Sequence, residues 1–190
     1  KKSIDELGQR LATALPRIDV LINNAGGAFW ERGVTADGVE RSLALNLLAP
    51  FQLTNALLPL LERSAPARVI NVATKPRKGD LIDLGDLQSE KKYDCFGTYG
   101  RAKTGLIMMT YEFARRLEGR GITVNCLHPG VVTETNFSQA LPTMMRLLGP
   151  VFARVSGMRA SLADAADTAV YLATAPELAS TSGKYFVRHQ

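Results

Sequence analysis

The sequence is poor in the residues that build disulfide frameworks and metal sites. Its 190 residues include two cysteines, two histidines and one tryptophan. Cys95 and Cys126 cannot form the multi-bridge framework of a small secreted protein, and neither has a partner at zinc-ligand spacing. His128 and His189 also stand outside any metal-ligand pattern. We therefore expect a protein of a reducing compartment, the cytoplasm, with no bound metal.

Long hydrophobic runs are missing as well. The longest uncharged, apolar-rich stretch covers residues 42–61, and polar residues and prolines such as Asn46, Pro50 and Pro59 interrupt it. Such a stretch is a poor membrane span. The first six residues, KKSIDE, lack the apolar segment of a signal peptide. The sequence thus predicts no membrane-spanning segment in this chain.

A strong excess of one charge sign is also absent. Lysine and arginine number 23 against 18 aspartates and glutamates, a net charge of +5, and the basic residues are spread among the acidic ones. We therefore expect no nucleic-acid partner. The hydrophobic share of 46% and the charged share of 22% are typical of a globular protein. This length predicts a single domain over residues 1–190.

What the sequence does contain is a regular alternation of strand and helix patterns. Short runs that are apolar at nearly every residue predict strands at 18–22, 68–73, 122–127 and 184–187. Apolar residues at helical spacing predict helices over about 3–15, 37–63, 98–118 and 162–173. This alternation predicts an α/β fold, a doubly wound parallel sheet with helices on both faces.

Ligands of such sheets bind beyond the carboxyl ends of the strands. Residues 23–27, Thr74 and residues 129–133 directly follow the first three predicted strands. The candidate functional residues should therefore lie together at one edge of the sheet.

Tyr99 and Lys103 are the first candidates for chemistry, because four residues apart on a helix they share one face. An ammonium group near a phenol favours the phenolate, so the pair could transfer protons to or from a substrate oxygen. The same spacing also occurs between unrelated residues on exposed helices. Thr74 offers a hydroxyl to a carbonyl oxygen, or simply satisfies a turn. Asn46 lies within an apolar helix face and serves either as a polar relay to Lys103 or as a packing residue.

Taken in order, these residues resemble the short-chain dehydrogenase/reductase superfamily. The matching motifs are Asn23-Asn24-Ala25-Gly26, Asn46, the strand-end Thr74, Tyr99-x-x-x-Lys103 and Pro129-Gly130-Val131-Val132-Thr133. Within the superfamily the chain is most similar to the retinol-dehydrogenase-like group, through segments such as 35–40, 83–87, 127–132 and 182–186. The resemblance covers essentially the whole chain and implies a Rossmann-type fold.

The resemblance implies an oxidoreductase that moves a hydride between a nicotinamide cofactor, NADP or NAD, and an apolar alcohol, aldehyde or ketone. In that scheme Tyr99 is the general acid/base, Lys103 lowers its pKa and holds the cofactor ribose, and Thr74 orients the substrate oxygen. Asn46 would hold a water that links Lys103 to solvent. The implied cofactor contacts are Asn24, Ala25, Gly26, Tyr99, Lys103, Pro129, Gly130, Val132 and Thr133.

Two departures from the family pattern stand out. Threonine at position 74, preceded by Ala73, replaces the usual serine; it keeps the hydroxyl but adds a methyl group that restricts the rotamer. The glycine-rich phosphate-binding turn, which in the family follows the first strand, occurs nowhere in the sequence.

The absent turn leads to a hypothesis about length. The first predicted strand matches the family's fourth, so three strands and on the order of 60–70 residues would precede it, at about 30 residues per βαβ unit. Without them, residues 18–22 would present an unpaired apolar edge. We therefore expect a fold that is incomplete at its N-terminus, the sequence being part of a longer chain.

Several alternatives remain open at the level of sequence. A catalytically silent nucleotide-binding or scaffold protein of the same fold, or a sugar-nucleotide-modifying relative, would also fit Thr74. The apolar segment 141–158 resembles the family's substrate-covering segment, or it makes an oligomer contact. Lys75, Arg77 and Lys78 either favour an acidic ligand or form a solvated loop. By resemblance, the helices at 37–63 and 98–118 would pack against a second copy, making the protein a homo-oligomer.

Overall fold

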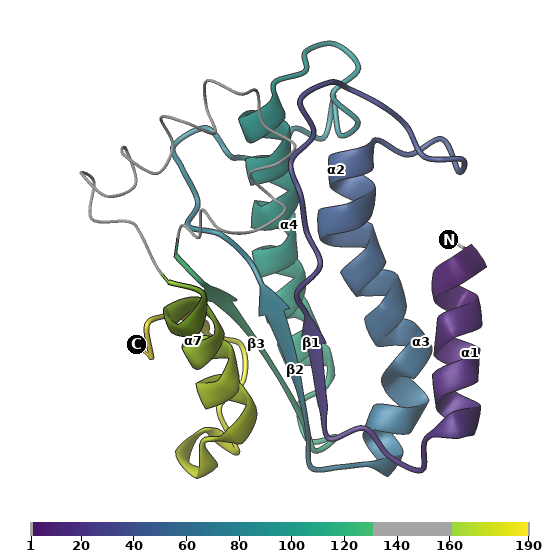
Figure 1. Ribbon diagram of the computed structural model, residues 1–190, viewed down its shortest axis with the longest axis vertical. Helices are drawn as coiled ribbons and strands as arrows, with labels where there is room; N and C mark the ends of the chain where they lie inside the picture. The colour runs from purple at the N-terminus through teal and green to yellow at the C-terminus, as the bar shows by residue number, and fades with distance from the viewer. Residues whose placement is uncertain (1, 131–160, 190) are drawn as a thin grey trace.

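A computed structural model describes residues 2–130 and 161–189 of the chain (Figure 1). In chain order its elements are α1 (Lys2–Ala14), β1 (Val20–Asn23), α2 (Arg41–Leu43), the π-helical η1 (Ala44–Leu48), α3 (Ala49–Arg63), β2 (Ala67–Val72), α4 (Cys95–Arg116), β3 (Ile122–His128), α7 (Leu162–Thr174), the 3₁₀ turn η2 (Pro176–Leu178) and β4 (Tyr185–Val187). All four predicted strands and all four predicted helices are present.

The strands form one sheet in the order β1-β2-β3-β4, and every neighbouring pair is parallel. Asn23 at the end of β1 lies opposite Asn71 of β2, which lies opposite Cys126 of β3. Parallel neighbours require crossover connections, and those between β1, β2 and β3 contain α3 and α4. The predicted α/β doubly wound sheet is therefore confirmed, with its carboxyl ends aligned along one edge.

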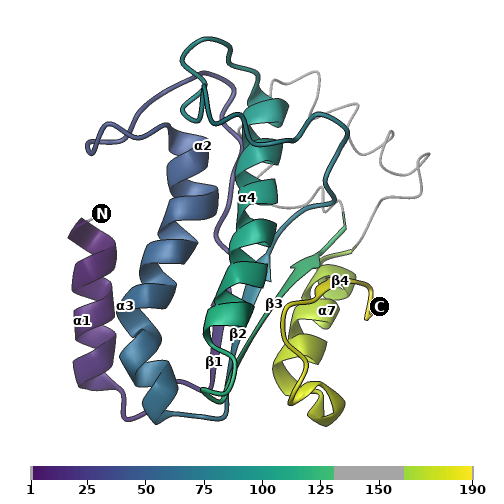
Figure 2. The same ribbon diagram turned by 180° about the vertical axis from the view of Figure 1, so that it is seen from behind.

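Helices cover both faces of the sheet (Figures 1 and 2). On one face α3 and α4 pack against a core that includes Leu57, Leu61, Val69, Phe113 and Val124, and α1 packs against α3. On the other face α7 packs on a second core made of Ile70, Leu127, Leu172 and Phe186. Successive strand residues point to opposite faces, so Val69 and Ile70 of β2 belong to different cores.

The long second helix differs from the prediction at its start. It begins at Arg41 and not near Asp37, because the Glu40 carboxylate caps it by accepting hydrogen bonds of 2.8 Å from the backbone N–H groups of Ser42 and Leu43. Residues 44–48 form a π-helix, in which the Ala49 N–H bonds to the Ala44 carbonyl five residues back. Pro50, which has no N–H to continue the α-helical ladder, follows directly.

Length and apolar composition alone would allow this helix, Arg41–Arg63, to cross a membrane, and it is the one such helix among the described residues. In the fold its inner face packs on the sheet through Leu57 and Leu61. Two of its buried polar side chains, Asn46 and Thr54, are hydrogen-bonded to the loop that follows β1 and to β1. The structure uses this helix to cover the sheet.

A chain of buried polar side chains joins four elements beneath this face of the sheet. Asn23 donates to Thr54 Oγ1 at 3.2 Å and to Asn71 Oδ1 at 2.8 Å. Asn71 donates to Thr110 Oγ1 at 2.9 Å, and Thr110 donates to the Leu106 carbonyl at 2.8 Å. The four polar side chains are buried. Because buried polar groups are costly when unpaired, this chain fixes how α3, β1, β2 and α4 fit together.

We predict that Thr110→Val will lower the free energy of unfolding by about 1–3 kcal/mol, because valine keeps the shape of threonine but leaves Asn71 without its acceptor. The measurement is urea-induced unfolding. Thr13→Val is the matched control: Thr13 also donates to the carbonyl four residues back in a helix but is exposed, so its variant should stay within about 0.5 kcal/mol of wild type. Equal losses in the two variants would contradict a special role for the buried chain.

Candidate active site

The carboxyl ends of β1, β2 and β3 bring three predicted segments to one edge of the sheet. Residues 24–26 follow β1, Thr74 lies two residues after β2, and Pro129 and Gly130 follow β3. Asn24, Ala25 and Gly26 are exposed, so this rim is accessible. Gly130 has a φ of +85°, which favours glycine at that position. Val132, Thr133 and the segment 141–158 lie outside the described residues.

Helix α4 carries Tyr99 and Lys103 to the same edge. It starts at Cys95, earlier than the predicted Thr98, because the Asp94 side chain caps it by accepting from the Gly97 N–H. The Lys103 ammonium is buried and donates to the carbonyl of Val72, the last residue of β2, at 2.7 Å. The ammonium also lies 6.0 Å from the centre of the Tyr99 ring. The two residues therefore share one helix face turned toward the end of β2.

Thr74 lies beside Tyr99. Its side chain is near enough to the Tyr99 phenol to lower the pKa of that group, and the Tyr185 hydroxyl of β4 donates to the Thr74 carbonyl at 3.3 Å. The strand-end hydroxyl and the phenol thus lie side by side, and β4, two strands away from β2 in the sheet, holds the backbone of Thr74 in place.

Burial dominates the acid–base properties of Tyr99 and Lys103. It raises the pKa of Tyr99 to about 12, against the lowering effects of the Thr74 side chain and the Arg77 charge. It also lowers the pKa of Lys103 to about 8. The Arg77 charge lowers the pKa of Tyr99. The lowering by Lys103 that the sequence predicted stays a prediction.

Asn46 and Gly26 surround the Lys103 ammonium. Asn46 donates to the carbonyls of Gly27 and Ser42, each at 2.8 Å, and accepts from the Gly27 N–H at 3.1 Å, so it ties the loop after β1 to the π-helix. A Cβ atom on Gly26 would lie only 2.9 Å from Asn46 Oδ1 and 3.0 Å from Lys103 Nζ. Only a glycine lets the backbone approach both groups this closely.

The sequence missed a pair of residues beside this site. Arg77 was interpreted as part of a solvated loop or as a contact to an acidic ligand, and Asp80 was not singled out. In the structure the two side chains are paired, Arg77 Nη2 lying 2.9 Å from Asp80 Oδ1. Outside a helix, a three-residue spacing of opposite charges does not indicate a pair, so the sequence carried no signal for it.

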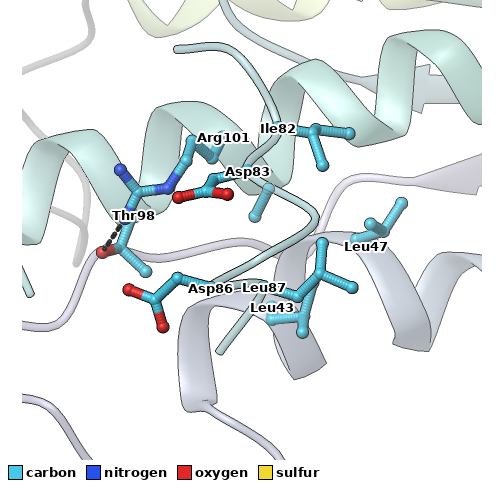
Figure 3. Close-up of a pocket in the computed structure, with 9 residues that line it drawn as sticks. Leu43, Leu47, Ile82, Asp83, Asp86, Leu87, Thr98 and Arg101 are labelled. Carbon is cyan, nitrogen blue, oxygen red and sulfur yellow. Dashed lines mark hydrogen bonds between the residues drawn. The ribbon is translucent and has the colours of Figure 1, made fainter. Parts of the chain in front are cut away.

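A pocket beside the connection from β2 to α4 is too small for a substrate (Figure 3). Its volume is about 30 Å³, which is roughly that of one water molecule. It is lined by Leu43, Leu47, Ile82, Asp83, Asp86, Leu87, Thr98, Arg101 and Ala102. The pocket shows that the connection packs down on the first turns of α4 and on η1. Within the described residues, no cluster of three histidine, cysteine, aspartate or glutamate side chains could hold a metal ion.

Comparison with known proteins defines the class. Residues 1–146 match the family model described as short chain dehydrogenase, and the chain belongs to this family. It is 41% identical to human retinol dehydrogenase 14 over 186 residues, which are 97% of this chain and 55% of that protein. It is 40% identical to human retinol dehydrogenase 13 over 190 residues, or 97% and 56% of the two chains. The chain thus spans about half the length of these relatives.

Solved structures agree on the fold. The Pseudomonas aeruginosa RhlG/NADP active-site complex superposes with a TM-score of 0.69 at 26% identity, covering 98% of this chain and 70% of that one. A Caenorhabditis elegans short-chain dehydrogenase/reductase of unknown function, solved with cofactor, has a TM-score of 0.74 at 24% identity and covers 98% and 69%. The second likeness supports the fold alone.

We predict that Gly26→Ala will destabilise the protein by about 1–3 kcal/mol, because the new methyl group must displace the locked Asn46 side chain or the buried Lys103 ammonium. Gly27→Ala is the matched control, since a Cβ there would make an ordinary 3.5 Å contact with Leu45 Cδ2. Chemical unfolding of both variants measures the difference. A loss as large in Gly27→Ala would show that the crowding around Lys103 is not the cause.

Proposed function

We propose that the protein is an oxidoreductase that exchanges a hydride between a nicotinamide cofactor, NADP or NAD, and an apolar alcohol, aldehyde or ketone, with Tyr99 as general acid/base. The observation that carries this proposal is the placement of Tyr99 next to Thr74 and 6.0 Å from the buried ammonium of Lys103, at the carboxyl edge of a parallel sheet. Membership of the short-chain dehydrogenase family and similarity to retinol dehydrogenases support it.

The residues around Gly26 fit a bound nucleotide. Asn24, Ala25 and Gly26 form an exposed rim, and the missing Cβ of Gly26 lets this rim lie close against the Lys103 ammonium and Asn46. We assign this rim and Lys103 to cofactor binding, together with Pro129 and Gly130 and, outside the described residues, Val132 and Thr133. When bound, the nicotinamide supplies or accepts the hydride.

The chain's own contribution is proton transfer and orientation. With a pKa of about 12 the Tyr99 phenol is protonated at neutral pH, the form that can donate a proton to a carbonyl oxygen. In the reverse direction the phenolate would accept the proton of an alcohol. The Thr74 hydroxyl orients the same oxygen, and Asn46 positions the loop that carries Gly26.

The apolar character of the substrate rests on the relatives and on the rim of the site. Two relatives, each about 40% identical to this chain, are named retinol dehydrogenases. Trp30, in the loop after β1, is 48% exposed and is available to an apolar ligand, whereas the neighbouring Phe29 ring is covered by the Arg41 guanidinium at 4.7 Å. The segment 141–158, predicted to cover the substrate, remains part of this proposal.

We predict that Tyr99→Phe in the full-length protein will lower turnover by at least about 100-fold, because it removes the transferable proton, while cofactor binding persists. NADH and NADPH oxidation with a panel of apolar aldehydes measures turnover, and nicotinamide fluorescence measures binding. Tyr111→Phe is the control, since it changes an exposed tyrosine on the same helix.

Undiminished activity of Tyr99→Phe would refute the acid/base role. Cofactor binding with no turnover in the wild type would favour a catalytically silent protein.

We also propose that the outer faces of α3 and α4 form the contact between two copies of the chain. A groove of about 410 Å³ runs between these helices. Apolar side chains such as Phe51, Leu58 and Met109 line it, together with the polar Asn55, Glu112, Arg116 and Arg120. Phe51, Met108 and Tyr111 are about half exposed. Large apolar side chains gathered on one face are typical of a protein–protein interface.

We predict that Met108→Glu will convert the oligomer to a monomer, because it places a charge in the apolar contact. Sedimentation velocity measures the oligomeric state. Leu84→Glu is the control, since Leu84 is 83% exposed but lies in the connection between β2 and α4. A wild-type protein that is monomeric at micromolar concentration would exclude the proposed contact.

A cytoplasmic location remains a proposal. Cys95 and Cys126 are both buried free thiols, as expected of a protein that folds in a reducing compartment. Fluorescence microscopy of the tagged full-length protein tests it, and a signal confined to the secretory pathway would refute it.

A further inference from the structure

The connection from β2 to α4 carries an ion pair next to the Thr74–Tyr99 pair. Arg77 Nε and Nη2 donate to the two oxygens of Asp80 at 3.1 and 2.9 Å. The backbone N–H of Arg77 also donates to Asp80 Oδ2 at 2.9 Å. Arg77 Nη2 further donates to the carbonyl of Phe96, in the first turn of α4, at 2.6 Å. This two-point pairing with a further bond to the helix holds the Arg77 guanidinium in one orientation.

The Asp80 side chain packs closely against the backbone of α4 at Gly100. It is only 4% exposed, and any Cβ atom on Gly100 would overlap its carboxylate. Gly100 directly follows Tyr99, so the carboxylate packs on the helix at the position of the proposed acid/base. Asp80 thereby joins the connection that begins at Thr74 to the helix that carries Tyr99.

We propose that Arg77, oriented by Asp80, is a positioning residue that keeps Thr74 in register with Tyr99 and supplies the positive charge that favours the Tyr99 phenolate. The inference rests on the proposed function, because it concerns the reactivity of the same tyrosine. Arg77 is then a second cation near Tyr99, besides Lys103. Arg77 lies in the connection from β2 to α4, whereas Lys103 lies on α4.

The charges around Tyr99 support a role for Arg77 that is separate from the role of Lys103. Arg77 and Tyr99 interact electrostatically, and the Arg77 charge lowers the pKa of Tyr99. The hydrogen bond to Asp80 raises the pKa of Arg77, so this cation is permanent. The other charged groups at this place are Lys103 on α4, with a pKa lowered to about 8, and Asp94, which acts on Arg77.

The test is the pH dependence of alcohol oxidation by the full-length enzyme. Arg77→Gln/Asp80→Asn replaces the ion pair with two neutral amides, so no buried carboxylate is left without a partner. Because the pKa of Tyr99 is about 12, the usable pH range lies on the rising acid limb of kcat/KM. Removing the cation raises that pKa, so this rising line should be displaced to higher pH by about half a unit to one unit. Looser positioning of Thr74 should lower kcat by about tenfold, with the KM for the cofactor within about twofold of wild type.

Two single variants separate charge from geometry. Arg77→Lys keeps the charge but cannot pair with both oxygens of Asp80, so it should restore the position of the acid limb and leave kcat reduced. Lys78→Gln removes a neighbouring exposed charge from the same connection and should leave both quantities as in wild type.

An acid limb that coincides in the wild type, the double variant and Lys78→Gln would overturn the inference, as would an equal shift in Lys78→Gln. The Tyr99→Phe variant distinguishes a failure of the acid/base role of Tyr99 from a failure of the positioning role of Arg77. If Tyr99→Phe is inactive and the acid limb does not move, only the role of Arg77 fails. If Tyr99→Phe remains active, the acid/base role of Tyr99 fails with it, and so does this inference.

Discussion

The hydrogen bond from the buried Lys103 ammonium to the Val72 carbonyl is the constraint around which the site is built. The ammonium of a lysine that is 3% exposed must be paired, and this one is paired with the last carbonyl of a central strand. The bond therefore fixes the position of α4 along β2. It also fixes where Tyr99, one helical turn before Lys103, lies relative to Thr74, which is two residues after Val72. The close approach of Gly26 and the side chain of Asn46 complete the enclosure on the β1 side.

Burial of this cation also has a cost that depends on pH. Because burial lowers the pKa of Lys103 from 10.5 to about 8, the unfolded chain binds more protons than the folded one between these values. This group therefore makes the fold more stable as pH rises from about 8 to 10.5, and its penalty is fully present below about pH 8. The buried chain from Asn23 to Thr110 incurs no such penalty, because its members are neutral and hydrogen-bonded to one another.

The sequence predicted most of the fold because each strand is a short apolar run and each long helix has a clear apolar face. The helix boundaries were harder to predict. Glutamate is not a favoured N-cap residue, so Glu40 left no signal for the start at Arg41. A 3.6-residue period could not show the π-helix at 44–48.

In the site, Tyr99, Lys103 and Thr74 were predictable from spacing and strand ends. Arg77 and Asp80 were not, because residues 73–94 have no period that fixes their path.

The two cations near Tyr99 differ in ways that suit different tasks. Lys103 is buried, and its reduced pKa places it close to neutrality, so its charge responds to whatever binds beside it. Arg77 is half exposed and always charged, and its orientation depends on a buried carboxylate. Exposure screens the Arg77 charge, so its influence on Tyr99 is modest, but it is independent of pH. Asp80 therefore matters mainly through geometry: it turns an exposed, flexible side chain into a fixed charge and, by packing on Gly100, joins that charge to the helix that carries the tyrosine.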